Sequence, residues 1–273
     1  RLADNRVATT VRAPGLTGLA ISRHTGLLLV LGMVMFAVMG VSMGPVYDQM
    51  APQLVTVSQS MPSALLQMWG ATDMASPAGF YWGETMSLMA PATVTVAGAA
   101  IATALGSDER SGCLGLLLAA GLPRWRVLAY TITAQAIVVT AIAILTGLGI
   151  WGGTLLGDVS LPAGNIAGAA LHLLALGLFV SATATLAVAA VGTPAAAAWT
   201  ATGVGLVSYF INVTLPMNPN LADWAKISPF HWYGAANPLE NGADWGNVAI
   251  LLAGSAVLLA ASFPLFTRRD LRV

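Results

Sequence analysis

The residues best able to do chemistry in this sequence gather in one stretch, "GSDERSGCLGLLLAAGLPRWRVL" at 106–128. The stretch holds two acids and three arginines, in a chain whose charged residues are only 8% of the total. Its leucines recur at helical spacing, so they share one apolar face. This pattern is typical of an interfacial helix that joins two membrane spans, or of a helix that docks on another protein.

Other chemistry finds little support in the sequence. Cys113 is the single cysteine, so an internal disulfide is excluded, and we expect no metal site because no Cys/His cluster has ligand spacing. The single lysine, Lys226, lies in "DWAKISPF", so the chain lacks the G-x-x-x-x-G-K-[ST] phosphate-binding loop. An intramembrane hydrolase would need a nucleophile beside a base, and no G-x-S-x-G motif accompanies His172.

The elements that position these residues are membrane helices. Hydrophobic residues make up 57% of the 273 residues, and a spanning helix needs ~20 mostly apolar residues. The sequence predicts an all-α integral membrane protein with six spans, at 27–47, 81–105, 127–156, 166–191, 195–215 and 248–266. We also expect a cytoplasmic loop helix after the second span, and short external helices before the second and the sixth.

The charges sort to two sides of this topology, and the positive-inside rule then places both termini in the cytoplasm of a plasma-membrane protein. We expect a cytoplasmic lead-in at 1–26, a six-helix transmembrane domain at 27–267 and a cytoplasmic tail at 268–273. The predicted cytoplasmic arginines are Arg1, Arg6, Arg12, Arg23, Arg110, Arg124, Arg126, Arg268, Arg269 and Arg272. The predicted outer side carries Lys226 with Asp48, Asp73, Asp158, Asp223, Glu240 and Asp244.

The stretch at 106–128 is therefore expected to lie in a cytoplasmic loop. Ser107 or Asp108 is a candidate N-cap, and Asp108 with Glu109 suits the positive end of a helix dipole. Gly121 and Pro123 are typical of a helix end. The apolar run is too short to cross a bilayer, and spacing alone leaves the linker and the docking interpretations open.

Three segments, in order, resemble type-2 ABC permeases, the membrane subunits of one class of ATP-binding cassette exporters. "GSDERSGCLGLLLAAGLPRWRVL" is similar to the segment after their second span. "MPSALLQMWGATDMASPAGFYWGE" is similar to their external segment before it, and "ISPFHWYGAANPLENGADW" with the terminal "FTRRDL" is similar to their last external loop and tail. The resemblance covers about 61–271 and departs from the family pattern at 111–114.

This resemblance implies a coupling helix that sits in a groove of a separate ATPase subunit. That subunit would bind ATP and Mg, so this chain would be no enzyme by itself. The resemblance also implies a second permease half, identical or related, and export of a solute that the apolar sequence suggests is hydrophobic. The residues expected to contact the ATPase subunit are Asp108, Glu109, Arg110, Leu114, Leu117, Leu118, Pro123 and Arg124.

Small residues recur every fourth position in the fifth predicted span, at Ala197, Ala201 and Gly205. This small-xxx-small pattern allows two helices to approach closely. We expect it to contact either the second membrane half or another helix of the same half.

Polar residues within the spans are candidates for a pathway. Gln135 and His172 are costly in lipid and are expected to face the bundle interior, paired with hydroxyls such as those of Thr183 or Thr140. Structural packing is favoured over a proton relay, because no carboxylate lies mid-span. Glu84 either lines a vestibule or is hydrated at the interface.

The external segments are long and rich in aromatic residues. Leu65, Leu66 and Trp69 give the first an amphipathic centre that suits the membrane surface. The second carries a predicted anchoring belt of Trp224, Phe230, Trp232, Tyr233 and Trp245. The resemblance implies that short helices here cap the exit, with Pro229, Phe230 and Trp232 as candidate site residues.

A secondary transporter or channel without an ATPase partner remains the alternative function. Such proteins usually show ion-pairing carboxylates or broken helices at mid-membrane, and these are scarce in this sequence.

Overall fold

The computed structural model describes residues 15–60 and 73–270, and all regular secondary structure in those residues is helical. Six segments within them are long and apolar enough to cross a membrane. They are Thr25–Val57, Pro77–Arg110, Arg124–Leu156, Ala163–Val191, Pro194–Met217 and Trp245–Arg268. Each of the six predicted spans lies within one of these segments, so the predicted all-α membrane fold is confirmed.

The spans are built from the following helices. The first contains α2 (Thr25–Met33), the π-helical η1 (Val34–Val41) and much of α3 (Met43–Ser60); the second contains α5 (Pro77–Tyr81), the π-helical η2 (Trp82–Met86) and α6 (Met89–Arg110). The others are α8 (Arg124–Leu156), α9 (Ala163–Val191), α10 (Pro194–Thr214) with η3 (Leu215–Met217), and α13 (Trp245–Arg268). Shorter helices are α1 (Leu16–Ser22), α7 (Cys113–Ala119), η4 (Ala222–Ile227), α11 (Pro229–Gly234) and α12 (Pro238–Asn241).

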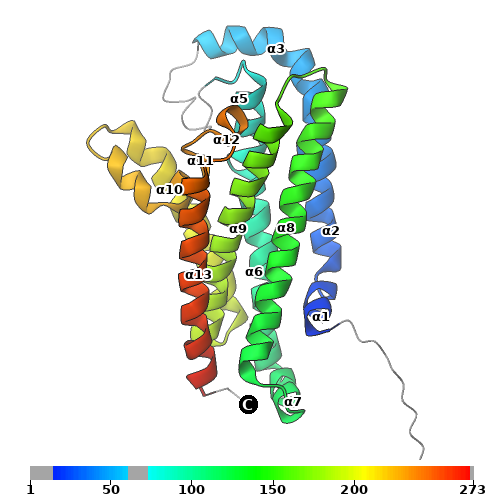
Figure 1. Cartoon of the computed structure of the whole chain (residues 1–273), viewed down its shortest axis with the longest axis vertical. Helices are drawn as coiled ribbons and strands as arrows, with labels where there is room; N and C mark the ends of the chain where they lie inside the picture. Colours follow the sequence, from blue (N-terminus) through cyan, green and yellow to red (C-terminus); the bar gives the residue numbers. More distant parts are fainter. Residues whose placement is uncertain (1–14, 61–72, 271–273) are drawn as a thin grey trace, which may run out of the picture.

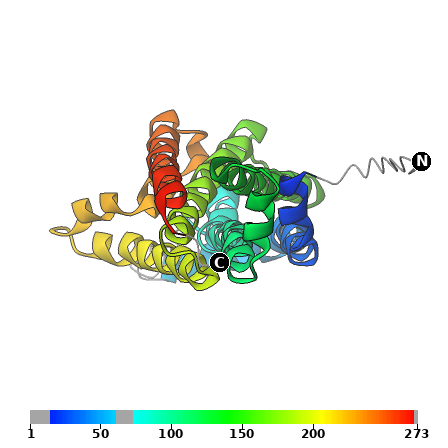
Figure 2. The same cartoon turned by 90° about the horizontal axis from the view of Figure 1, so that it is seen from below.

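The two ends of the bundle differ in content (Figure 1). The helices α1 and α7 and the last residues of α13 lie at one end, which we call the basal end. The helices α3, α5, α11 and α12 lie at the other, which we call the distal end. Figure 2 shows α10 and the segment after it on one side of the bundle, with α1 and α2 on the opposite side. Arg1, Arg6, Arg12, Leu65, Leu66, Trp69 and Arg272 are outside the described residues.

Local capping explains where several helices begin. Thr193 accepts a hydrogen bond from the backbone N–H of Ala196 at 3.3 Å, and Pro194 occupies the first turn of α10. Ser76 with Pro77 starts α5 in the same way, and Ser228 with Pro229 starts α11. The side-chain oxygen satisfies one otherwise free N–H, and proline needs none at that position.

A glycine seam joins the first span to α8. Gly40 and Gly44 face Gly149 and Gly153, and a Cβ atom at Gly40 would lie 2.5 Å from the backbone of Gly149. A Cβ atom at Gly44 would lie 1.8 Å from the carbonyl oxygen of Gly153. Only glycine permits such an approach, so these small-xxx-small pairs fix how the two spans cross.

Hydrogen bonds hold the second span against the π-helical part of the first. Thr85 Oγ1 donates to the carbonyl of Met39 at 2.7 Å, and the Tyr81 hydroxyl donates to the carbonyl of Gly40 at 3.2 Å. Side chains of the second span thus donate to backbone carbonyls of η1. Irregular backbone at membrane depth needs such partners within the protein, because lipid supplies none.

Candidate functional site

The loop helix α7 lies at the basal end between α6 and α8 (Figure 1). It begins after Gly112, which has a φ of 75°, and ends before Gly121, which has a φ of 87°. The prediction that Ser107 or Asp108 caps a new helix is wrong, because α6 continues through both residues to Arg110. The predicted helix end at Gly121 and Pro123 is confirmed, because α7 ends at Ala119 and a new helix, α8, begins directly after Pro123.

The orientation of α7 changes which leucines face outward. Leu114 is 1% exposed and packs in the main hydrophobic core, whereas Leu116 is 74% exposed. Leu117 and Leu118 are half-buried, and Leu117 lines a small cavity beside α1. The predicted apolar face of Leu114, Leu117 and Leu118 therefore turns toward the bundle, and Leu116 is left outside it.

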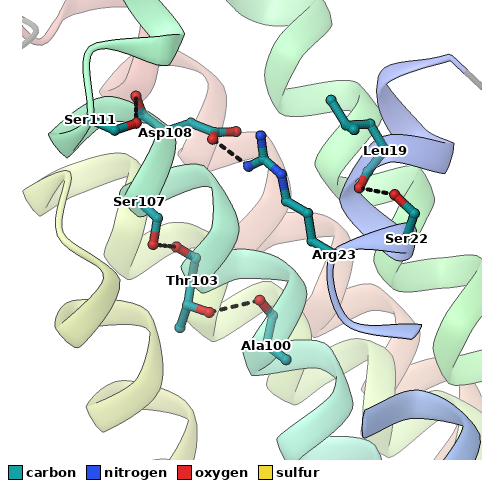
Figure 3. Close-up of polar contacts among 8 residues, drawn as sticks. All are labelled: Leu19, Ser22, Arg23, Ala100, Thr103, Ser107, Asp108 and Ser111. Atoms are coloured by element: carbon teal, nitrogen blue, oxygen red, sulfur yellow. Dashed lines mark hydrogen bonds and ion pairs between the residues drawn. The ribbon is translucent and has the colours of Figure 1, made fainter. Parts of the chain in front are cut away.

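Asp108 is held by an ion pair with Arg23, just after α1 (Figure 3). The hydrogen bond from Arg23 to this carboxylate raises the pKa of the Arg23 guanidinium. The Ser107 hydroxyl donates to the carbonyl of Thr103 at 3.0 Å, and so does not cap a helix. Asp108 therefore ties α1 to α6 within the chain.

Glu109 is paired inside the protein. Its side chain accepts two hydrogen bonds from Arg269, at 2.7 Å from Nη1 to Oε1 and at 2.5 Å from Nη2 to Oε2. Arg269 Nε also donates to the carbonyl of Ala189 at 3.1 Å. Glu109 is 3% exposed, so the prediction that this acid contacts a separate subunit directly does not fit the structure. The pair instead joins the ends of α6, α9 and α13.

Gly192 and Arg124 complete this arrangement. Gly192 ends α9 at a φ of 75°, and a Cβ atom there would lie 2.1 Å from Arg269 Nη1 and 2.6 Å from Glu109 Oε1. Arg124 Nη1 donates to the carbonyls of Thr267 at 3.0 Å and of Arg269 at 2.8 Å. The start of α8 is thereby bound to the end of α13. We call Glu109, Arg124, Gly192 and Arg269 the basal joint.

Other basal side chains face outward. Arg110 and Arg126 are exposed, and the Arg126 guanidinium carbon lies 5.4 Å from the centre of the Trp125 ring. Trp125 is 51% exposed. Leu116 is exposed at the same end, and we call these four residues the basal face. They combine apolar side chains and positive charge. Such a combination suits a protein contact with an apolar centre and an acidic rim.

Gln135 lies in a buried polar cluster between α6, α8 and α9. Its Nε2 donates to the carbonyls of Gly98 at 2.9 Å and of Ser181 at 3.3 Å, and its Oε1 accepts from Thr185 at 2.7 Å. The predicted partner Thr183 instead donates to its own helix at Val180. The partner is therefore the residue two positions further along α9.

His172 binds, through both ring nitrogens, the segment that contains α11 and α12 and ends at Asp244, which we call the distal segment. The backbone N–H of Asp244 donates to Nε2 at 3.1 Å, so Nε2 is the acceptor; Nδ1, 2.9 Å from the carbonyl of Tyr233, is then the donor. A backbone N–H can only donate, which fixes this neutral tautomer. The predicted hydroxyl partners are wrong, because the backbone of the distal segment supplies both bonds.

The predicted distal site residues are part of an aromatic cluster. Phe230 is buried against Tyr209 and Tyr233, and the Trp232 indole donates to the carbonyl of Lys226 at 2.9 Å. Pro229 starts α11 behind the Ser228 cap. Burial, with a smaller contribution from the Lys226 charge, lowers the pKa of nearby His231. Glu84 lies in η2 and is exposed.

The small residues of α10 pack inside the same chain. Ala197 and Ala201 are fully buried, and a Cβ atom at Gly205 would lie 3.6 Å from Thr95 of α6. Of the two contacts expected for this stripe, the structure shows the one within the same half, against α6 at Gly205. The large apolar side chains that α10 exposes are Trp199, Leu206, Val207 and Phe210.

The seam of Gly40, Gly44, Gly149 and Gly153 was missed at the sequence level, although the GxxxG spacing is present in both spans. Arg269 was assigned only to a tail, and no local pattern links it to Glu109. Among the described residues no group of three or more His, Cys, Asp or Glu side chains could hold a metal ion.

Residues 15–267 match the protein family described as "Multidrug efflux system permease Rv1217c, C-terminal domain". A search of curated proteins found no match. The family match covers the loop helix α7, the first five spans and all but the last residue of the sixth.

Proposed function

The chain belongs to the family of the multidrug efflux system permease Rv1217c, C-terminal domain, and we propose that it is the membrane subunit of an ATP-driven exporter. A transport permease with membrane-spanning helices follows from the family and the six spans. The proposal adds a separate ABC-type ATPase subunit that binds ATP and Mg and docks on the basal face.

The observation that carries this proposal is the position of α7 and its connection to the neighbouring spans. It is a short helix with an outward apolar residue, Leu116, and it lies directly between the ends of α6 and α8. The basal joint ties those same ends to α9 and α13. A partner that displaces α7 would therefore displace the ends of four spans together. Such a connection is needed if the partner is to move membrane helices.

The docking residues are revised from those expected in the sequence. Leu116, Trp125, Arg110 and Arg126 supply the contact, with Leu117 and Leu118 at its edge. Four of the residues expected at this contact bond or pack within the chain instead, and so support the basal face without contacting the partner: Leu114, Asp108, Glu109 and Arg124. Positive charge beside an apolar centre favours an acidic partner surface and fixes its register.

The basal end is proposed to lie in the cytoplasm of a plasma-membrane protein. Among the described residues, all the arginines lie at this end, whereas Lys226 lies in the segment after α10. An excess of arginine on cytoplasmic loops is the common rule for multi-pass proteins.

A second membrane half is proposed to complete the pathway, either as a separate copy or as another domain. Glu84 supports this, because an exposed carboxylate near the distal end of a span is costly in lipid and is better placed against water or protein. The exposed side chains of α10 offer an apolar surface for the same contact. The proposed cargo is a hydrophobic solute.

Co-purification tests the proposal. The tagged chain is extracted in mild detergent from its own host, and we expect a nucleotide-binding subunit to be retained. The complex in nanodiscs should hydrolyse ATP faster when hydrophobic compounds are added. Transport by the purified chain alone, driven by an ion gradient without nucleotide, would establish the secondary-transporter alternative instead.

A further inference from the structure

A groove of about 450 Å³ lies between α8 and α9. Its lining includes Thr140, Ile144, Leu148 and Trp151 from α8, and both small and larger residues from α9, among them Ala167, Ala170 and Leu174. These positions belong to the distal half of both helices, and both helices are membrane spans. The groove therefore opens at hydrocarbon depth and stands apart from the basal face.

The lining selects an apolar occupant. No lining residue is charged, and the side chains that carry polar atoms, Thr140 and Trp151, stand at opposite ends. A charged or strongly polar ligand would lose its hydration and find no partner along the walls. The occupant must therefore be hydrocarbon over most of its length.

The length and lining of the groove favour a single straight occupant. The two helices come close at Gly147, where a Cβ atom would lie 3.2 Å from the Cβ of Ala170. From Thr140 to Trp151 the helix rises ~17 Å, about half of a ~30 Å hydrocarbon core. One chain from one leaflet fits this length.

We propose that the groove binds a single unbranched hydrocarbon chain that enters from the leaflet at the distal end. The chain lies along α8 and α9 with its polar head beside Trp151 and its methyl end toward Thr140. A membrane phospholipid and a free fatty acid share this chemistry. The assignment depends on the membrane spans alone, so it stands or falls separately from the proposed ATPase partner.

Photolabelling in nanodiscs tests the site. The nanodiscs contain phosphatidylcholine with a diazirine halfway along one acyl chain, or the matching diazirine fatty acid in plain phosphatidylcholine. After illumination, peptide mass spectrometry maps the adducts. We expect them to concentrate on Ile144, Leu148 and Ala170, above the level at Val257 of α13, although Val257 is more exposed.

A groove-filling variant makes the test specific. Ala167→Phe should reduce the groove adducts several-fold, whereas Ala249→Phe should leave them unchanged. Ala167 and Ala249 are both exposed alanines, each four residues beyond the first residue of its span. Adducts from either probe support the site, and the probe that labels identifies the source of the chain. Adducts spread evenly over all lipid-facing helices, or groove adducts that survive Ala167→Phe, would overturn it.

Discussion

The Glu109 carboxylate and the Arg269 guanidinium, 160 positions apart in the sequence, meet in a two-pronged ion pair at the basal end of the bundle. The pair is buried, and Arg269 also donates to the last turns of α9. A buried carboxylate needs its counter-charge, so the pair fixes three spans relative to one another.

Removing one partner of this pair should destabilise the protein more than removing both. Arg269→Ala removes the arginine that neutralises a buried carboxylate, at a cost of about 3–5 kcal/mol. The double variant Glu109→Ala/Arg269→Ala removes that charge and should recover part of the loss. Chemical unfolding in mild detergent measures both. Lys226→Ala is the control, since the Lys226–Asp223 pair is exposed and should contribute little. Equal losses in the single and double variants would contradict the pairing.

Gly192 should be irreplaceable at the end of α9. In Gly192→Ala the residue keeps a left-handed backbone at ~1–2 kcal/mol, and its Cβ also pushes on Arg269 and Glu109. We expect a lower melting temperature. Gly203→Ala in α10 is the matched control, because its Cβ would meet nothing within 4 Å and alanine favours a helix. Equal melting temperatures for the two variants would show that Arg269 and Glu109 can move away from an added Cβ at Gly192.

The glycine seam predicts a strong effect of an added methyl group at Gly153 of α8, where this helix contacts the first span. Gly153→Ala would place a Cβ 2.3 Å from the Tyr81 hydroxyl and 2.5 Å from the carbonyl of Gly40. Overpacking of this kind costs ~1–3 kcal/mol. Gly26→Ala, with open space around its Cβ, should be tolerated. Thermal unfolding followed by circular dichroism distinguishes them, and a fully stable Gly153→Ala would show that the spans can separate freely.

The sequence was sufficient to predict the six spans, because hydropathy reports directly on the surrounding lipid. Helix starts such as Thr193 with Pro194 also depend on a signal that lies within a few residues. Spacing identified the small stripe at Ala197 and Ala201, but a stripe does not say which helix covers it.

The start of α7 shows why the rest could not be predicted. Ser107 and Asp108 have the residue types of an N-cap, yet α6 runs on to Arg110. Glu109 is stabilised there by Arg269 and Asp108 by Arg23, and both partners are distant in sequence. Local propensity is easily overridden by such contacts. The same long-range pairing removed Glu109 from the predicted docking surface.

His172 should control the opening of the distal segment. His172→Phe keeps a ring of similar size but leaves the Tyr233 carbonyl and the Asp244 N–H without their partner, at about 1–3 kcal/mol. Leu239, which is buried in this segment, is changed to cysteine in a Cys113→Ala background. The labelling rate of Leu239→Cys should rise in His172→Phe and stay low in the control His231→Gln. Equal rates in all variants would show that other contacts hold the segment.

Two positions of α7, the outward Leu116 and the buried Leu114, separate docking from folding. Leu116→Asp puts a carboxylate on an exposed position, so we expect an unchanged melting temperature. If the basal face docks on an ATPase subunit, the same carboxylate is buried without a partner in the complex, and affinity should fall at least ~30-fold, or about 2 kcal/mol. Leu114→Asp is the matched contrast, because Leu114 lies in the core and its replacement should unfold the basal end. Pull-down of the ATPase subunit, with the melting temperature measured on the same sample, checks both. Full binding and full ATP-driven transport in Leu116→Asp would refute docking on the basal face and leave α7 as a link between two spans.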